Sequence, residues 1–307
     1  MELEFKVKNN QFFNVKEIIK SYFQISDRLL IKLKREKRIF LNNAPVYVTE
    51  KVCIGDVLKL DMNFTEESDN IVPTEMKLDI IFEDDYLLII NKSAGIPVHP
   101  SCNHYENSLS NGVKYYFNSI GLNKKIRPVN RLDKDTSGIV IFAKHEYIQE
   151  ILVRQMKNNT FKKEYLAILE GSLDKTSDTI NAPIARKAGS IMEREISEKG
   201  ETAISHFELI KNFENYCAVK YTLETGRTHQ LRVHSKYIGH SILGDSLYGT
   251  TSDLISRQAL HAHKVTFAHP ITKENLTLEA PFPQDILNLI KWKPLSNYVL
   301  WVMMKEN

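Results

Sequence analysis

Cysteine is scarce in this chain of 307 residues, and so are long apolar runs. The three cysteines, Cys53, Cys102 and Cys217, lie far apart without a CxxC pair, which argues against a disulfide framework and a structural zinc site. The N-terminal segment MELEFKVKNN lacks the apolar stretch of a signal peptide, and the apolar run Tyr298–Met304 is far too short to span a bilayer. We therefore expect a cytoplasmic protein without a membrane partner.

Motifs for a metal, a nucleotide or a flavin are also missing. Two histidine pairs have spacings that a metal site could use, His229 with His234 and His261 with His263. Neither pair has a cysteine or an acidic residue to complete a ligand set, and ten histidines make such spacings common by chance. We therefore expect structural histidines, no bound metal and no cofactor.

Charge of one sign shows no large excess over the whole chain, which carries 41 basic and 38 acidic residues and a formal net charge of +3. The basic excess is concentrated between Lys16 and Arg38, where eight basic residues stand against three acidic ones. That segment therefore has a net charge of +5, and the remainder has a net charge of −2. A local basic excess of this kind is expected where a protein binds nucleic acid.

Residues 1–65 are predicted to form a small module with two helices and short strands. Apolar residues at helical spacing from Val15 to Phe23 predict the first helix, and Ser26 or Asp27 can cap the second. Strands are expected at Ile39–Leu41 and Pro45–Val48, on either side of an asparagine turn. The second helix carries three leucines on one face and three basic residues on another, Arg28, Lys32 and Arg35.

This module resembles the alpha-L domain, a small RNA-binding module first known from a small-subunit ribosomal protein. The resemblance lies in the two short helices, the basic second helix and the hairpin that begins at Ile39–Asn42. It implies that Arg28, Lys32 and Arg35 bind RNA. A solvated lysine-rich helix face is the alternative interpretation.

An acidic, polar segment at 66–77 is predicted to link this module to a larger domain at 78–295, followed by a C-terminal tail at 296–307. Within the larger domain, strands are expected at 78–83, 86–91, 161–170, 202–210 and 216–223, and helices at 109–117 and 145–158. Many strands with few helices between them predict an α+β fold, with flanking helices on a mixed, mainly antiparallel sheet.

One stretch concentrates reactive side chains in twelve positions, Arg127-Pro-Val-Asn-Arg-Leu-Asp-Lys-Asp-Thr-Ser-Gly138. Turn-forming residues from Lys134 to Gly138 precede the apolar run Ile139–Ala143, which predicts a loop followed by a buried strand. Arg131 and Asp133 would then lie on a loop held by a rigid strand, where reactive groups are often found. Taken alone, the stretch is more typical of a charged surface turn.

Further motifs give this stretch a context. Asn130–Gly138 resembles the signature of the RluA/RluD family of pseudouridine synthases, Lys163–Ala167 its tyrosine motif, and Gly226–His234 its third motif. Segments 91–95, 244–249 and 260–262 follow in the family's order. Several motifs in register, covering about residues 78 to 285, are much more specific than any one of them.

The resemblance implies an isomerase that converts uridine in RNA to pseudouridine without gain or loss of atoms. It makes Asp133 the essential carboxylate at the sugar–base junction, Arg232 its ion-pair partner and Tyr165 the active-site tyrosine. A nearby guanidinium favours an ionised carboxylate, and a tyrosine ring can stack on an extruded base. The chain departs from the family pattern at Asn130, where His is frequent, and at Ser93, where Pro is usual.

The resemblance also implies that the target base leaves its stack before it reacts. Arg131 matches the family residue that assists this base flipping. Arg227 is expected to contact the RNA backbone or a phosphate, and His229 is assigned to RNA binding beside it. We expect large-subunit ribosomal RNA as the substrate, with transfer RNA as the second choice, and a monomeric enzyme.

Other functions stay open from the residues themselves. A basic module would also suit a non-catalytic RNA-binding factor in ribosome assembly. Asp133 and Asp135 could form a carboxylate pair for hydrolysis of a sugar bond if both faced one side of an extended segment. Asp135 lies in the predicted turn, where binding to loop amides is the better expectation. Taken singly, Tyr165 would equally suit a core and Arg232 an ordinary ion pair.

Overall fold

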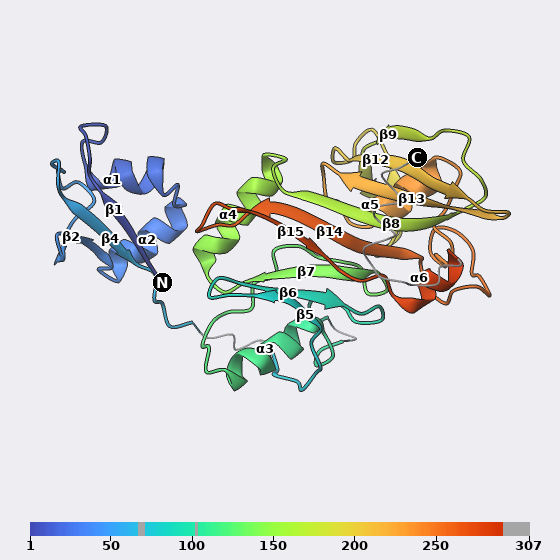
Figure 1. Ribbon diagram of the computed structural model, residues 1–307, viewed down its shortest axis with the longest axis horizontal. Coiled ribbons are helices and arrows are strands. Elements are labelled where there is room, and N and C mark those ends of the chain that lie inside the picture. Colours follow the sequence, from blue (N-terminus) through green and yellow to red (C-terminus); the bar gives the residue numbers. More distant parts are fainter. Residues whose placement is uncertain (67–70, 102–103, 291–307) are drawn as a thin grey trace.

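A computed structural model of the chain describes residues 1–66, 71–101 and 104–290. Figure 1 shows a small N-terminal part beside a larger part that is built on one long twisted sheet. The predicted C-terminal tail at 296–307 and Cys102 lie outside the described residues. In the part of the chain that the structure describes, no helix is long and apolar enough to cross a membrane.

The N-terminal part is a four-stranded sheet in the order β1-β4-β2-β3, with its helices on the side that faces the larger part (Figure 1). Its elements are β1 (Glu2–Lys6), α1 (Val15–Glu17), the π-helical turn η1 (Ile18–Tyr22), α2 (Asp27–Arg35), β2 (Ile39–Leu41), β3 (Ala44–Pro45) and β4 (Val57–Asp61).

Local sequence signals explain most of these elements. The Ser26 hydroxyl accepts a 3.2 Å hydrogen bond from the Leu29 amide and caps α2, as predicted. The strand predicted at Pro45–Val48 is wrong beyond Pro45, because the chain turns at Tyr47, whose carbonyl accepts a 3.1 Å hydrogen bond from the Glu50 amide.

The larger part carries most of the described strands. It contains β5 (Ile80–Glu83), β6 (Leu87–Lys92), α3 (Leu109–Ser119), β7 (Ser137–Ala143), α4 (Glu146–Lys157), β8 (Lys162–Glu170), β9 (Ser177–Asn181), β10 (Ile184–Arg186), β11 (Arg194–Ile196), β12 (Ile204–Asn212), β13 (Tyr216–Leu223), α5 (Gln230–Tyr237), β14 (Leu260–Ala268), β15 (Asn275–Glu279) and α6 (Gln284–Leu289).

These strands form a nine-stranded sheet in the order β5-β6-β7-β14-β8-β13-β12-β9, with β15 paired to β14, and a separate hairpin of β10 and β11. Among the described strands, only β7 and β14 pair in parallel. The predicted α+β fold with a mainly antiparallel sheet is therefore confirmed. The run after Gly138 is the buried strand that the sequence predicted, because every residue of β7 is buried.

The sheet order brings two distant motifs together. Ala262 of β14 is the Cα partner of Gly138 in β7 on one side and of Tyr165 in β8 on the other. Gly138 has a φ of +115°, and a Cβ at this position would lie 2.2 Å from the Ala262 carbonyl oxygen. Only glycine permits this close approach of the backbones, so the loop before β7 ends beside the strand that carries Tyr165.

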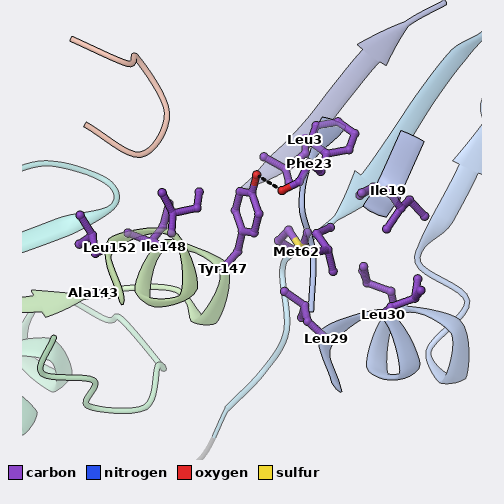
Figure 2. Close-up of a cluster of buried hydrophobic side chains, with 14 of the residues drawn as sticks. Leu3, Ile19, Phe23, Leu29, Leu30, Met62, Ala143, Tyr147, Ile148 and Leu152 are labelled. Atoms are coloured by element: carbon purple, nitrogen blue, oxygen red, sulfur yellow. Dashed lines mark hydrogen bonds between the residues drawn. The ribbon is translucent and has the colours of Figure 1, made fainter. Parts of the chain in front are cut away.

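The two parts share one hydrophobic cluster, formed where the N-terminal helices meet α4 (Figure 2). Leu29 and Met62 of the N-terminal part pack toward Tyr147 of α4. Polar contacts border the cluster: Glu66, expected in a polar linker, is buried and accepts a 2.6 Å hydrogen bond from Arg127 Nη2. The contact between the two parts is therefore both apolar and ionic.

Candidate active site

A cleft of about 1090 Å³ lies in the larger part. Its lining includes the loop Asn130–Asp133 before β7, the start of β8, the turn Thr225–His229 and the first turn of α5, together with residues 97–99 and the end of α4. Among the sequence-predicted residues, Arg131, Asp133, Tyr165, Arg227, His229 and Arg232 all line this cleft. Residues scattered over a hundred positions of sequence thus converge on one concave site, as ligand sites in proteins usually do.

The loop that carries Asp133 is fixed by its backbone. The Thr136 amide donates to the Asp133 carbonyl at 3.1 Å and closes a turn. The buried Lys92 ammonium donates to the carbonyls of Lys134, Ser93 and Ile96 at 2.8–2.9 Å. Burial lowers the pKa of Lys92 to about 7, against the opposing effect of nearby carboxylates. Three carbonyl acceptors require three N–H donors, which the ammonium form alone supplies.

Arg232 joins Asp133 to a second, fully buried carboxylate. Its Nη1 donates to Asp133 Oδ2 at 3.2 Å. Its Nε and Nη2 donate to the two oxygens of Asp245 at 2.7 and 2.8 Å. The predicted pairing of Arg232 with Asp133 is present, but the bidentate partner is Asp245. The sequence named the segment 244–249 without a role for Asp245, because its partner lies 13 residues away in the chain.

His229 lies on the other side of the same carboxylate. Its Nε2 is 3.9 Å from Asp133 Oδ2, and its Nδ1 is 2.8 Å from the Tyr248 hydroxyl. The residue adopts a left-handed conformation, with a φ of +57°, at the position before α5. Burial is the main cause that lowers the pKa of His229, while the charge of Asp133 raises it.

Tyr165 is buried at the floor of the site, in the strand β8. Burial and the charge of Asp133 raise the pKa of its hydroxyl, which therefore stays protonated at neutral pH. Its ring lines the cleft, and its side chain also belongs to the core cluster beneath the site.

Other predicted residues lie at the rim. Arg131 is exposed at the mouth of the cleft. Arg227 donates from Nε to the Thr202 carbonyl at 2.9 Å and forms an ion pair with Glu201. Asn130 turns its amide to the backbone of β7, where it donates to the Ile139 carbonyl and accepts from the Ile141 amide, both at 2.9 Å. At this position the side chain anchors the loop to its strand.

The three basic residues predicted on α2 lie in the N-terminal part and do not line the cleft. Arg28 and Arg35 have largely exposed side chains. Lys32 is only 23% exposed, and its ammonium is 3.2 Å from Glu66, 3.6 Å from Glu146 and 3.8 Å from the centre of the Phe64 ring.

One histidine of each predicted pair has structural surroundings. His234 Nδ1 is 2.9 Å from the Ser205 hydroxyl, and His261 Nδ1 is 2.9 Å from the Ser137 hydroxyl; both rings are buried. Across the described ranges, no group of three or more His, Cys, Asp or Glu residues is arranged to hold a metal ion. The cleft therefore brings together the carboxylate of Asp133, its neighbours Arg232 and His229, and the aromatic ring of Tyr165.

Comparison with known proteins gives this arrangement a family. Residues 86–237 match the model of the family described as RNA pseudouridylate synthase. The chain is 41% identical over 276 residues to the uncharacterized RNA pseudouridine synthase YhcT of Bacillus subtilis, an alignment that covers 89% of this chain and 91% of that protein. It is 34% identical to the ribosomal large subunit pseudouridine synthase D of Blochmanniella floridana, over 83% of this chain and 86% of that protein.

The fold has a counterpart among solved structures. Human RNA pseudouridylate synthase domain containing 1 superposes with a TM-score of 0.60 at 24% identity, over 75% of this chain and 96% of that one. The sequence relatives and this shared fold agree with the motifs that meet at the cleft. The chain therefore belongs to the RNA pseudouridylate synthase family, in its RluA-type branch, and is an isomerase that acts on RNA.

Proposed function

We propose that this enzyme isomerises specific uridines of large-subunit ribosomal RNA, with Asp133 acting at the sugar–base junction. In this reaction the bond between the ribose and N1 of uracil breaks, and a bond from the ribose to C5 forms. N1 gains a proton and C5 loses one, so the atoms balance. The observation that carries the proposal is the position of Asp133, which lies near the N-terminal end of α5 between the side chains of Arg232 and His229.

The contacts of Asp133 support a role as a reacting carboxylate. Its side chain is 26% exposed, so one face is open to the cleft while Arg232 holds the other. Arg232 reaches Asp133 through Nη1 alone, because its bidentate fork is held by Asp245. Names of the relatives also support ribosomal RNA as the substrate, since the protein from Blochmanniella floridana is named for the large ribosomal subunit.

Tyr165 and Arg131 complete the proposed mechanism. The Tyr165 ring would stack on the extruded uracil, an interaction worth about 1–3 kcal/mol, and its hydroxyl would help to remove the C5 proton. Arg131, exposed beside the cleft, would fill the space that the flipped base leaves. Flipping costs a few kcal/mol, which such contacts offset. Arg227 and His229 would bind the RNA around the flipped nucleotide.

The N-terminal part is proposed to be an RNA-binding module of the alpha-L type. We assign residues 1–65 to it, 66–77 to a linker, 78–295 to the catalytic domain and 296–307 to a tail. Support comes from the basic helix α2 and the hairpin turn at Asn42 and Asn43, both of which have positive φ. Such a module would deliver the enzyme to ribosomal RNA in the cytoplasm, as a monomer and without a metal or cofactor.

The test is to map pseudouridines in a strain that lacks this gene. Carbodiimide adducts on pseudouridine stop reverse transcriptase, so a site that the enzyme makes would lose its stop in the deletion strain. Wild-type protein should restore the site and Asp133→Asn should not. Full restoration by Asp133→Asn would contradict the assigned role, and loss of sites in transfer RNA alone would contradict the assigned substrate.

A matched control separates the isomerase from a hydrolase that uses both carboxylates of the loop. Asp135 contributes its backbone carbonyl, which accepts a 3.1 Å hydrogen bond from Arg257. Asp135→Asn should therefore restore the site, whereas a hydrolase with paired carboxylates would lose activity in both variants. Purified enzyme should release tritium from RNA labelled at C5 of uridine and should release no free uracil.

A further inference from the structure

The turn Gly244–Gly249 carries side chains that contact Arg232 and His229, the two residues that lie beside Asp133. Residues Gly244–Gly249 fold back against α5, and Gly244 has a φ of +75° with the Arg257 carbonyl 2.4 Å from the position of a Cβ. The turn supplies Asp245, whose side chain is completely buried, and Tyr248, which is also buried. Neither side chain lines the cleft, so neither is placed to touch the RNA.

We propose that Asp245 and Tyr248 are positioning residues of the isomerase, which hold Arg232 and His229 in the orientations that face Asp133. The inference rests on the proposed role of Asp133 as the reacting carboxylate. It adds that one turn of the chain determines the orientation of both Arg232 and His229.

Asp245 determines which nitrogen of Arg232 is free. It accepts from Nε and Nη2, at 2.7 and 2.8 Å, and this bidentate pair leaves Nη1 to point at Asp133. Asp245 is itself fixed, because its Oδ1 also accepts from the amides of Leu247 and Tyr248 at 3.1 and 3.2 Å. A buried carboxylate needs a cationic partner, so Asp245 and Arg232 stabilise each other in one geometry.

Tyr248 acts on both partners of Asp133. Its ring lies under the guanidinium of Arg232, 5.0 Å from Cζ to the ring centre. Its hydroxyl oxygen accepts a 2.7 Å hydrogen bond from the Arg194 amide, which leaves the hydroxyl proton to donate to His229 Nδ1 at 2.8 Å. The remaining ring proton of neutral His229 then lies on Nε2, the nitrogen that faces Asp133. Tyr248 thereby selects the tautomer.

The first experiment is the variant Asp245→Asn. Its single-turnover rate on C5-tritiated ribosomal RNA should fall about 100-fold, the effect of a small misplacement of a catalytic group, while RNA affinity stays within about threefold. The split between rate and affinity reveals the cause, because Asp245 orients Arg232 and does not line the cleft that would hold the RNA. An unchanged rate, or an RNA affinity that falls in parallel with the rate, overturns the proposal.

Asp84→Asn is the matched control. Asp84 also accepts from two backbone amides through Oδ1, those of Tyr86 and Leu87 at 2.8 and 2.7 Å, and pairs through Oδ2 with His269 at 2.9 Å. It lies outside the cleft lining, so the substitution tests the loss of a turn-capping carboxylate alone. The rate and RNA affinity of this variant should match those of the wild type.

Tyr248→Phe keeps the ring and provides a second test if Asp245→Asn does not fold. Its single-turnover rate should fall about tenfold, the effect of one hydrogen bond. In ¹⁵N spectra, His229 should change from the single tautomer with the proton on Nε2 to a mixture. A wild-type rate and an unchanged tautomer overturn the proposal. If Asp133→Asn stays active the proposed function fails, whereas an inactive Asp133→Asn with fully active positioning variants rejects this inference alone.

Discussion

The Tyr147 hydroxyl, on α4 of the larger part, donates a 2.9 Å hydrogen bond to the Phe23 carbonyl in the N-terminal part (Figure 2). The two residues are 124 positions apart in the chain, and the bond is buried. Burial also raises the pKa of Tyr147 to about 12, so this donor keeps its proton at physiological pH. The contact fixes the N-terminal part against the catalytic sheet.

Removing that hydroxyl should weaken the contact between the two parts. We expect Tyr147→Phe to lower the free energy of unfolding by about 1 kcal/mol, the usual net value of one buried hydrogen bond. Tyr147→Ala should cost about 3–5 kcal/mol, because it also empties the space of the ring. Urea denaturation measures both. Tyr47→Phe, at a tyrosine that is 84% exposed, is the control; equal stability of Tyr147→Phe and wild type would contradict the prediction.

Arg35 and Lys32 should differ in their effect on RNA binding. Arg35 is 73% exposed, so Arg35→Ala should weaken binding to ribosomal RNA and reduce the slope of log affinity against log salt by about 1. The Lys32 ammonium is already paired with Glu66 and Glu146, so Lys32→Ala should leave that slope unchanged. Filter binding over a range of salt concentrations measures it. A larger slope change for Lys32→Ala than for Arg35→Ala would mean that α2 turns toward RNA on binding.

Gly138 should tolerate no side chain. Gly138→Ala places a Cβ within 2.2–2.7 Å of the Ala262 backbone and requires a left-handed φ, so we expect a loss of about 2–5 kcal/mol. Gly189 has a φ of +76° with no atom within 4 Å, so Gly189→Ala should cost only about 1–2 kcal/mol. Thermal unfolding of the two variants separates backbone strain from steric overlap. Similar melting temperatures would refute the steric explanation.

Tyr165→Phe should slow the removal of the C5 proton. The variant keeps the ring for stacking and loses the hydroxyl, so single-turnover rates should fall about 100-fold, within the range of general acid–base effects. Deuterium at C5 of uridine should then slow the variant more than the wild type, because breaking the C5–D bond limits its rate. Equal isotope effects in the two enzymes would remove the hydroxyl from the proton transfer.

His261 should make the fold sensitive to acid. Burial lowers its pKa from 6.5 to about 3, so the unfolded chain binds a proton in this range and the folded chain does not. The contribution is fully present above pH 6.5, and it decreases by about 1.4 kcal/mol for each pH unit as the pH falls from 6.5 toward 3.

The variant His261→Asn should therefore lose stability less steeply with falling pH than the wild type does. His206→Asn, at a histidine with a partly exposed side chain, is the control. His145, with its pKa lowered to about 4, and His234 act in the same direction as His261. Some slope should therefore remain in His261→Asn, and an unaltered slope would contradict the assignment to His261.

The sequence by itself predicted most local elements and six of the residues that line the candidate site. The cap at Ser26 and the buried strand after Gly138 depend on neighbours within a few positions, which a linear pattern records. The family motifs also predict that Asp133, Tyr165 and Arg232 share one site.

Tertiary structure alone decided how those residues are held. Asp133 and Arg232 are 99 positions apart, and the bidentate pair of Arg232 with Asp245 forms only when the turn at Gly244 folds against α5. Lys32 belongs to a solvated basic face in the linear pattern, yet it pairs with Glu66 because two parts of the chain meet there. The strength of an ion pair depends on the distance between the two charges in space, and the number of residues between them in the sequence does not determine that distance.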